Sequence, residues 1–208
     1  MSDALELVAA TLGLGFLSGL RLYGTVLALG LGIRFGIWKL SPEMSQLAVL
    51  ADGRVLAVAA VACAIEFVAD KIPWVDSLWD TIHTVIRPVG AVLIASQVLG
   101  DVDPAAKVLL MLLGGTVALA SHSSKAATRL AVNHSPEPFS NLALSLLGDL
   151  LVPAGLWMVF HHPVVTVTVV TLFLAVFAWF AVRVYRFLLR EFRGVGERFR
   201  PRARLAGA

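Results

Sequence analysis

Long apolar segments, separated by short polar stretches, make up most of the chain. A helix that crosses a bilayer needs about 20 mostly apolar residues. Six segments approach or exceed that length, and the second is the shortest: 5–33, 54–69, 81–99, 105–130, 142–160 and 164–189. Gly, Pro and acidic residues mark the gaps between them. The pattern predicts an all-α, polytopic membrane helix bundle of about six transmembrane helices.

The composition also indicates a membrane protein. Hydrophobic residues make up 58% of the chain and charged residues 15%, which is too few charges for the surface of a soluble domain. The N-terminal "MSDALELVAA" lacks the basic region of a signal peptide, so we expect the first apolar segment to remain as a span. The expected organisation is a single transmembrane domain, residues 1–190, followed by a basic tail, residues 191–208.

The two halves of the transmembrane domain, 1–100 and 101–190, have similar layouts. Each begins with an apolar segment that small residues and cations interrupt, "LSGLRLYGT" around Arg21 and "ASHSSKAATR" around Lys125. In each half, the next span carries acidic residues. Three spans per half are compatible with two inverted repeats whose first helices are broken, an arrangement that is common in secondary transporters.

Arg21 lies deep within the first apolar segment, two residues before Tyr23. A charge at the centre of a bilayer costs about 2.5–3.5 kcal/mol on insertion scales, so we expect a buried acidic partner or a water-filled cavity. Gly15 and Gly19 precede the arginine at a spacing that lets another helix approach closely. A purely structural arginine–carboxylate pair is the alternative.

The stretch "EFVADKIPWVDSLWDTIHTVIRP" concentrates ionisable residues between two apolar runs. These residues are Glu66, Asp70, Lys71, Asp76, Asp80, His83 and Arg87. The first two are four apart and share a helix face, and a break at Pro73 follows. The last four recur at steps of four, three and four, so they lie along one face of the next helix. Asp76 also fits a helix N-cap and Asp80 a first-turn acid.

A third polar stretch, "ASHSSKAATRLAVNHSPEP", follows the fourth apolar run. On a helix, four of its residues share a face: His122, Lys125, Arg129 and Asn133. The prolines around Glu137 end that helix. Asn141 and Asp149 then lie on one side of the fifth span, together with Ser145. Cations and acids in or beside the spans are nearly balanced in number, which predicts mutual pairing around a polar interior.

Known catalytic motifs are missing from the sequence. "SHSSK" has histidine where a Ser-x-x-Lys motif needs serine. There is no G-x-S-x-G, H-E-x-x-H or phosphate-binding Gly-rich loop, and Cys63 is the single cysteine. The adjacent His161 and His162 point in different directions on a helix. We therefore predict no catalytic residues, no metal site and no cofactor.

The C-terminal "RVYRFLLREFRGVGERFRPRAR" is strongly basic. Its first arginines recur at helical spacing where the last span emerges, so they are expected to contact anionic lipid headgroups. Basic loops stay cytoplasmic, which predicts a cytoplasmic C-terminus, and an even number of spans then places the N-terminus on the same side. The tail offers no folded basic module of the kind that binds nucleic acid, so no nucleic-acid partner is expected.

Three of these motifs together resemble a bacterial integral-membrane family known as domain of unknown function 4126. They are "SGLRLYGT", "EFVADKIPWVDSLWDTIHTVIRPVGA" and "ASHSSKAATRLAVNHSPEPFSN". The resemblance runs from about residue 12 to residue 163. It implies a multi-pass protein of the bacterial cytoplasmic membrane and carries no activity with it.

The sequence leaves three hypotheses about function. The leading one is a transporter or channel for a small solute, coupled to an ion or a proton, with a homodimer compatible with the small size of the chain. Its candidate binding residues are Arg21, Tyr23, Glu66, Asp70, Lys71, Asp80, His83, Arg87, His122, Lys125, Arg129, Asn133, Glu137, Asn141 and Asp149. A lipid-phosphate enzyme or flippase is the second hypothesis, in which Ser121, Lys125 and Arg129 hold the phosphate. In it, Glu66 and Asp70 act as acid/base residues or as metal ligands. A noncatalytic scaffold is the third.

Overall fold

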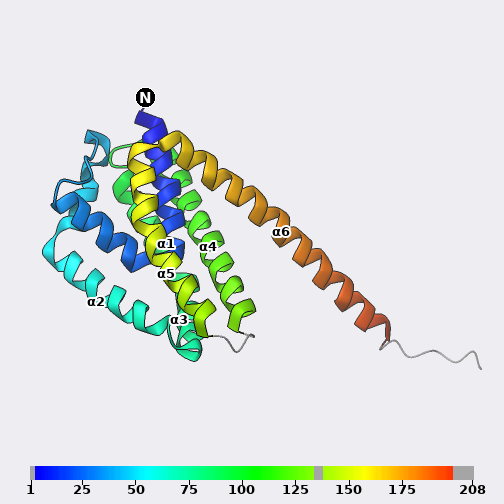
Figure 1. Ribbon diagram of the computed structural model, residues 1–208. Helices are drawn as coiled ribbons and strands as arrows, with labels where there is room; N and C mark the ends of the chain where they lie inside the picture. The colour runs from blue at the N-terminus through cyan, green and yellow to red at the C-terminus, as the bar shows by residue number, and fades with distance from the viewer. Residues whose placement is uncertain (1–2, 134–137, 199–208) are drawn as a thin grey trace, which may run out of the picture. The chain divides into compact units, whose positions relative to one another are not determined.

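The computed structural model describes the backbone of residues 3–133 and 138–198, and all side chains there except those of residues 73–74, 133, 138–142, 188 and 191–198. The elements, in chain order, are α1 (Asp3–Arg34), the 3-10 helix η1 (Pro42–Ala51), α2 (Gly53–Ala69), α3 (Pro73–Val98), α4 (Pro104–Asn133), α5 (Pro138–His161) and α6 (Pro163–Arg198) (Figure 1). No strand occurs in the described ranges. The predicted all-α, polytopic membrane bundle is confirmed.

In the described part of the chain, five helices are long and apolar enough to cross a membrane: α1, α3, α4, α5 and α6. The short second segment of the sequence corresponds to α2, which forms a bent pair with η1 at an angle of 65° and supplies a sixth span if the pair is counted as one. α3 begins at Pro73, well before the predicted start at residue 81. Proline is favourable in a first helical turn, and the helix therefore carries Asp76 and Asp80 as well as His83 and Arg87, as their helical spacing predicted.

α1 is broken at Arg21, as the small residues around it predicted. Arg21 has φ −149° and ψ 84°, outside the helical range. Beyond this break the chain turns back. Gly13 lies against Val159 of α5, while Trp38, which covers Gly32, stacks on the neighbouring Phe160. A straight helix would separate Gly13 from Gly32 by about 28 Å, so the second half of α1 returns toward the end of the bundle where the first half began.

The second predicted break, in the stretch 120–129, is wrong. α4 is one uninterrupted helix from Pro104 to Asn133. Its polar stretch contains neither proline nor glycine, and hydroxyl groups there bond within the helix, as Thr128 does when it donates to the carbonyl of Ser124 at 2.8 Å. The two predicted halves therefore begin with helices of different form, and their duplication stays a prediction.

Close backbone contact joins α1 to α4. A Cβ on Gly15 would lie 2.7 Å from the carbonyl oxygen of Gly114, and one on Gly19 would lie 2.2 Å from that of Ala118. Glycine is required at both positions because any side chain would push the helices apart. This contact confirms the expectation from the glycine spacing, and it brings the break in α1 beside the polar stretch of α4.

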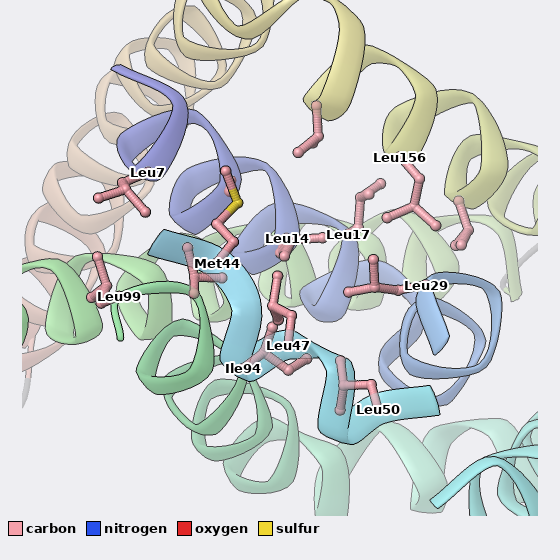
Figure 2. Close-up of a cluster of buried hydrophobic side chains, with 14 of the residues drawn as sticks. Leu7, Leu14, Leu17, Leu29, Met44, Leu47, Leu50, Ile94, Leu99 and Leu156 are labelled. Carbon is pink, nitrogen blue, oxygen red and sulfur yellow. The ribbon is translucent and has the colours of Figure 1, made fainter. Parts of the chain in front are cut away.

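The apolar core fills the end of the bundle opposite to that polar stretch. Side chains of α1, η1, α3 and α5 meet there, among them Leu14, Leu47, Ile94 and Leu156 (Figure 2). The contacts hold η1 against α1 and α3. The core thus fixes the first half of α1, which positions Arg21 at its far end.

The chain divides into two compact units, Met1–Thr171 and Leu172–Ala208. The first contains α1 to α5, the start of α6 and all of the polar interior described below. In the second, α6 continues past residue 190 as far as Arg198, and the guanidinium of Arg183 lies over the ring of Trp179 at 5.3 Å.

Candidate functional site

The carboxylate of Asp70, at the end of α2, is shared by three cations. Arg21 of α1 makes the closest contact, through Nη1 and Oδ2. From α4, Arg129 Nη2 lies 3.1 Å from Oδ2, and Lys125 Nζ lies 3.8 Å from Oδ1. The Asp70 side chain has no exposed surface. One buried anion therefore holds three positive side chains together. Charges in a low-dielectric interior need partners, because an unpaired buried charge is costly.

Arg21 also binds α5. Its Nε lies 3.1 Å from Oδ1 of Asp149, and its Nη2 donates to both the carbonyl and the hydroxyl oxygen of Ser145 at 3.0 Å. The side chain of Asp149 is 36% exposed, whereas that of Arg21 is 3% exposed. Arg21 thus connects a buried acid on one helix to a more accessible acid on another.

Arg129 extends the network to α3. It makes a close ion pair with Asp76 and a 3.1 Å contact with Asp70. The N-cap position of α3 is occupied by Ile72, so the capping interpretation of Asp76 is wrong. We name Asp70, Arg21, Lys125, Arg129, Asp76 and Asp149 the Asp70 group.

A second set of ion pairs surrounds Arg87 of α3, and we name Arg87, Glu66, Asp80 and His122 the Arg87 group. Nη2 of Arg87 lies 2.7 Å from Oε1 of Glu66 and 3.6 Å from Oδ1 of Asp80. Nη1 donates to His122 Nδ1 at 2.8 Å. Because arginine can only donate, the His122 Nδ1 accepts, and its Nε2 donates to the Asp80 carbonyl at 3.0 Å. This pattern assigns the neutral, Nε2-protonated imidazole.

The two groups also satisfy the backbone at the break in α1. Arg87 Nη1 donates to the carbonyl of Gly19 at 3.0 Å, and Lys125 Nζ donates to that of Leu20 at 3.2 Å. Ser121 donates to the carbonyl of Phe16 at 2.9 Å. The last carbonyls of a helix have no intrahelical partner and carry partial negative charge. The cations therefore have a structural function as well, since unpaired carbonyls in a membrane are costly.

His83 and Tyr23 form a smaller contact beside the Arg87 group. His83 Nδ1 donates to the carbonyl of Trp79 at 2.7 Å, and the hydroxyl of Tyr23 lies 3.2 Å from Nε2. The indole of Trp79 stacks on the imidazole with ring centroids 4.4 Å apart. These contacts attach the second half of α1 to α3.

Two cavities border the Asp70 group. The first, of about 220 Å³, lies among α1, α4 and α5 and is lined by the three cations that contact Asp70. We name it the cationic cavity. The second, of about 180 Å³, lies between α3 and α4 and is lined by Asp76 and Asp80. We name it the acidic cavity. Arg129 lines both cavities, so its ion pairs with Asp70 and Asp76 lie between the two spaces.

A match to a known protein family includes both groups of ion pairs. Residues 8–183 match the family described as Domain of unknown function (DUF4126). The chain belongs to this family. The match includes every member of the Asp70 and Arg87 groups. No curated protein and no solved structure matches the chain, so the chemistry of this family member has to be argued from its own residues.

Most of the candidate residues from the sequence are brought together in the two groups. Lys71 is an exception, because its Nζ lies over the ring of Phe67, 3.0 Å from the centroid, and donates to the carbonyl of the same residue. Asn133, Glu137 and Asn141 have side chains outside those that the structure describes.

Sequence reasoning did not place Asp76, Ser124, Thr128 and Ser145 among the binding candidates. The first pairs with Arg129, the last binds Arg21, and the other two line the cationic cavity. For Ser145, the four-residue step to Asp149 was a signal that the two side chains share a helix face. Serine and threonine are common on helix faces, so their residue type alone gave no signal for the other two.

Glu66 and Asp70 share a helix face but belong to different groups. The first binds Arg87, and the second binds Arg21, Lys125 and Arg129. Within the described part of the chain, no three His, Cys, Asp or Glu side chains lie together in the way that a metal site requires. The geometry gives no support to a shared metal at these two acids, which the lipid-phosphate enzyme hypothesis used.

Proposed function

We propose that this protein is a membrane transporter that moves a small anionic solute together with a proton or a cation. The observation that best supports the proposal is that Arg21, Lys125 and Arg129 contact one buried carboxylate and line one cavity. Ionisable residues inside membrane bundles are costly, and those that face a cavity typically mark a solute or ion pathway.

Charge balance around Asp70 offers a physical route to coupling. While its carboxylate is ionised, it neutralises part of the positive charge of the three cations. A proton or cation bound there would remove that neutralisation and favour an anion in the cationic cavity. By thermodynamic linkage, the anion would raise the affinity for the proton or cation by the same factor. Asp149, which shares Arg21 with Asp70 and is more exposed, is the entry point that we propose for the proton.

The break in α1 supports the same function. Secondary transporters bind their substrates near the bilayer midplane at discontinuous helices, where irregular backbone lines a cavity. In this chain the break at Arg21 lies beside the cationic cavity, and residues 20 and 21 both line it. A movement of either half of α1 would therefore change the cavity directly.

The test is coupled flux in liposomes that contain the purified protein and an internal pH dye. We expect an imposed gradient of phosphate or of a short carboxylate to drive proton movement. Asp70→Asn and Asp149→Asn should abolish this movement. Asp101→Asn is the matched control, since Asp101 is exposed in the α3–α4 loop and should leave the flux unchanged.

Two results would overturn the proposal. One is the absence of flux with folded, inserted wild-type protein across phosphate, carboxylates and monovalent cations. The other is unchanged coupling in both Asp70→Asn and Asp149→Asn, because the two carboxylates would then have no part in moving the proton.

We also propose a location, an orientation and an oligomeric state for the protein. We infer a bacterial cytoplasmic membrane location with the C-terminus inside, supported by the basic C-terminal sequence. The arginines of α6 would contact anionic headgroups there. A chain of 22.2 kDa encloses little internal volume for a solute pathway, and dimerisation would increase that volume.

A further inference from the structure

The cationic cavity has two chemically different sides. Its polar side carries the charged groups of Arg21, Lys125 and Arg129 together with the hydroxyl-bearing residues Ser124 and Thr128. This side offers N–H and O–H groups and three positive charges, and three carboxylates pair with these cations: Asp70, Asp76 and Asp149. The cations outnumber the carboxylates once Asp70 takes up the proton of the proposed coupling. Such a set matches a doubly charged oxyanion with several acceptor oxygens better than it matches a halide.

The opposite side of the cavity is lined by leucines of α5: Leu144, Leu147 and Leu151. Leu147 is 53% exposed and Leu151 is 39% exposed, although both line the cavity. The two helices that line the cavity beside α1 are α4 and α5, and each packs against α1 far more than against the other. Since exposed apolar side chains of a membrane bundle face lipid, the apolar side of the cavity opens toward hydrocarbon between α4 and α5.

The residues that line the cavity from α4 and α5 lie within candidate membrane spans, Pro104–Val132 and Ala143–His161. Lys125 is eight residues before the end of α4 at Asn133, which corresponds to about 12 Å along the helix axis. Gly148 is ten residues after the start of α5 at Pro138, or about 15 Å. A ligand that reached these cations from the bilayer would therefore carry its charged head into the membrane interior.

We propose that the cationic cavity binds a phosphate monoester attached to a hydrocarbon chain. The phosphate lies among Lys125, Ser124 and Thr128, and the chain leaves past Leu147 into the bilayer. A phosphate monoester carries a charge of about −1.5 to −2 at neutral pH and has three strong acceptor oxygens. The Lys125 ammonium and the Ser124 hydroxyl can donate to them, and Thr128 can do so by giving up its bond to the carbonyl of Ser124. This assignment rests on the proposed function and names the substrate class of the same site.

The test measures binding separately from transport. The protein is placed in nanodiscs of zwitterionic phosphatidylcholine with a small fraction of hexadecyl phosphate or of hexadecanol, and native mass spectrometry counts the bound amphiphile. We expect hexadecyl phosphate to bind well above hexadecanol. Lys125→Gln should weaken its binding about tenfold, the usual effect of removing a charged hydrogen-bond donor.

Matched controls separate the cavity from the rest of the surface. Leu147→Asn should weaken binding of the amphiphile several-fold, because it places a polar group where the chain leaves. Lys71→Gln removes a cation outside the cavity, and Leu109→Asn alters an exposed leucine elsewhere on α4. Both should leave binding unchanged. Equal binding of the phosphate and the alcohol, or equal loss in the Lys71 and Lys125 variants, would overturn the proposal.

Inorganic phosphate distinguishes the free ion from the lipid-borne group. If inorganic phosphate displaces hexadecyl phosphate at comparable concentration, the chain contributes nothing and the amphiphile assignment is wrong. Coupled phosphate flux with no amphiphile binding would overturn this inference and leave the proposed transport intact. Amphiphile binding that depends on Lys125, in a protein that moves no solute or proton, would support the ligand and overturn the transport.

Discussion

The polar interior contains two groups of ion pairs with different surroundings. In the Arg87 group, the side chains of Arg87 and Glu66 have no exposed surface, and Asp80 alone of the four members lines a cavity, the acidic one. In the Asp70 group, charges that are almost as deeply buried border both cavities. Burial alone therefore does not separate the two groups, and we propose that the cations around the cationic cavity are the binding charges.

This comparison predicts the largest loss of protein stability for a substitution in the Arg87 group. Arg87→Met leaves the Glu66 carboxylate buried without its cation and the carbonyl of Gly19 without its donor. We expect a loss of about 3–5 kcal/mol in the free energy of unfolding, the typical cost of breaking a buried pair, measured by SDS titration in mixed micelles. Arg54→Met is the control, because the Arg54 side chain is 92% exposed. A loss within 1 kcal/mol of that control would contradict the structural assignment of this group.

An intermediate effect is expected at Asp70. Asp70→Asn leaves three cations beside a cavity that an anion can enter, so we expect a stability loss of about 1–3 kcal/mol. Added phosphate should recover part of this loss, in proportion to the logarithm of its concentration once the site is filled. Chloride at matched ionic strength serves as the control for screening. Glu66→Gln should show no such recovery, and equal recovery in the two variants would remove the distinction between the groups.

The smallest effect on stability is expected at Asp149, which is the most accessible acid of its group. Asp149→Asn should cost no more than about 1 kcal/mol, as for other partly exposed ion pairs. The same SDS titration measures it. A small cost would mean that any loss of coupled flux in this variant reflects the missing carboxylate. A cost as large as that of Arg87→Met would place Asp149 among the structural charges.

Much of the fold and most of the binding candidates could be predicted from the sequence. Apolar length gave the helices, and the cost of a charge in lipid required that Arg21 find a buried partner. The glycine spacing before it predicted close approach of another helix, which Gly15 and Gly114 provide. These predictions hold because the membrane leaves few alternatives for backbone polar groups and for charges.

The pairing of charges could not be predicted in the same way. Helical spacing tells which residues share a face, and it placed Glu66 and Asp70 together. Which cation each one meets depends on how α1 bends, and the turn at Arg21 has no signal beyond small residues. The small residues of the α4 stretch are alanine and serine rather than glycine, and hydroxyl groups there bond within the helix, so α4 stayed unbroken.

The position of Arg21 in the chain also constrains how the protein is made. Every acid that contacts Arg21 belongs to a later part of the sequence, Asp70 at the end of α2 and Asp149 in α5. During synthesis α1 emerges before these acids, with an arginine whose partners have not yet been translated and with carbonyls whose donors are also still missing. We therefore expect α1 to stay at the membrane surface or with the insertion machinery until α5 has emerged, so that bundle assembly depends on the last of its partners.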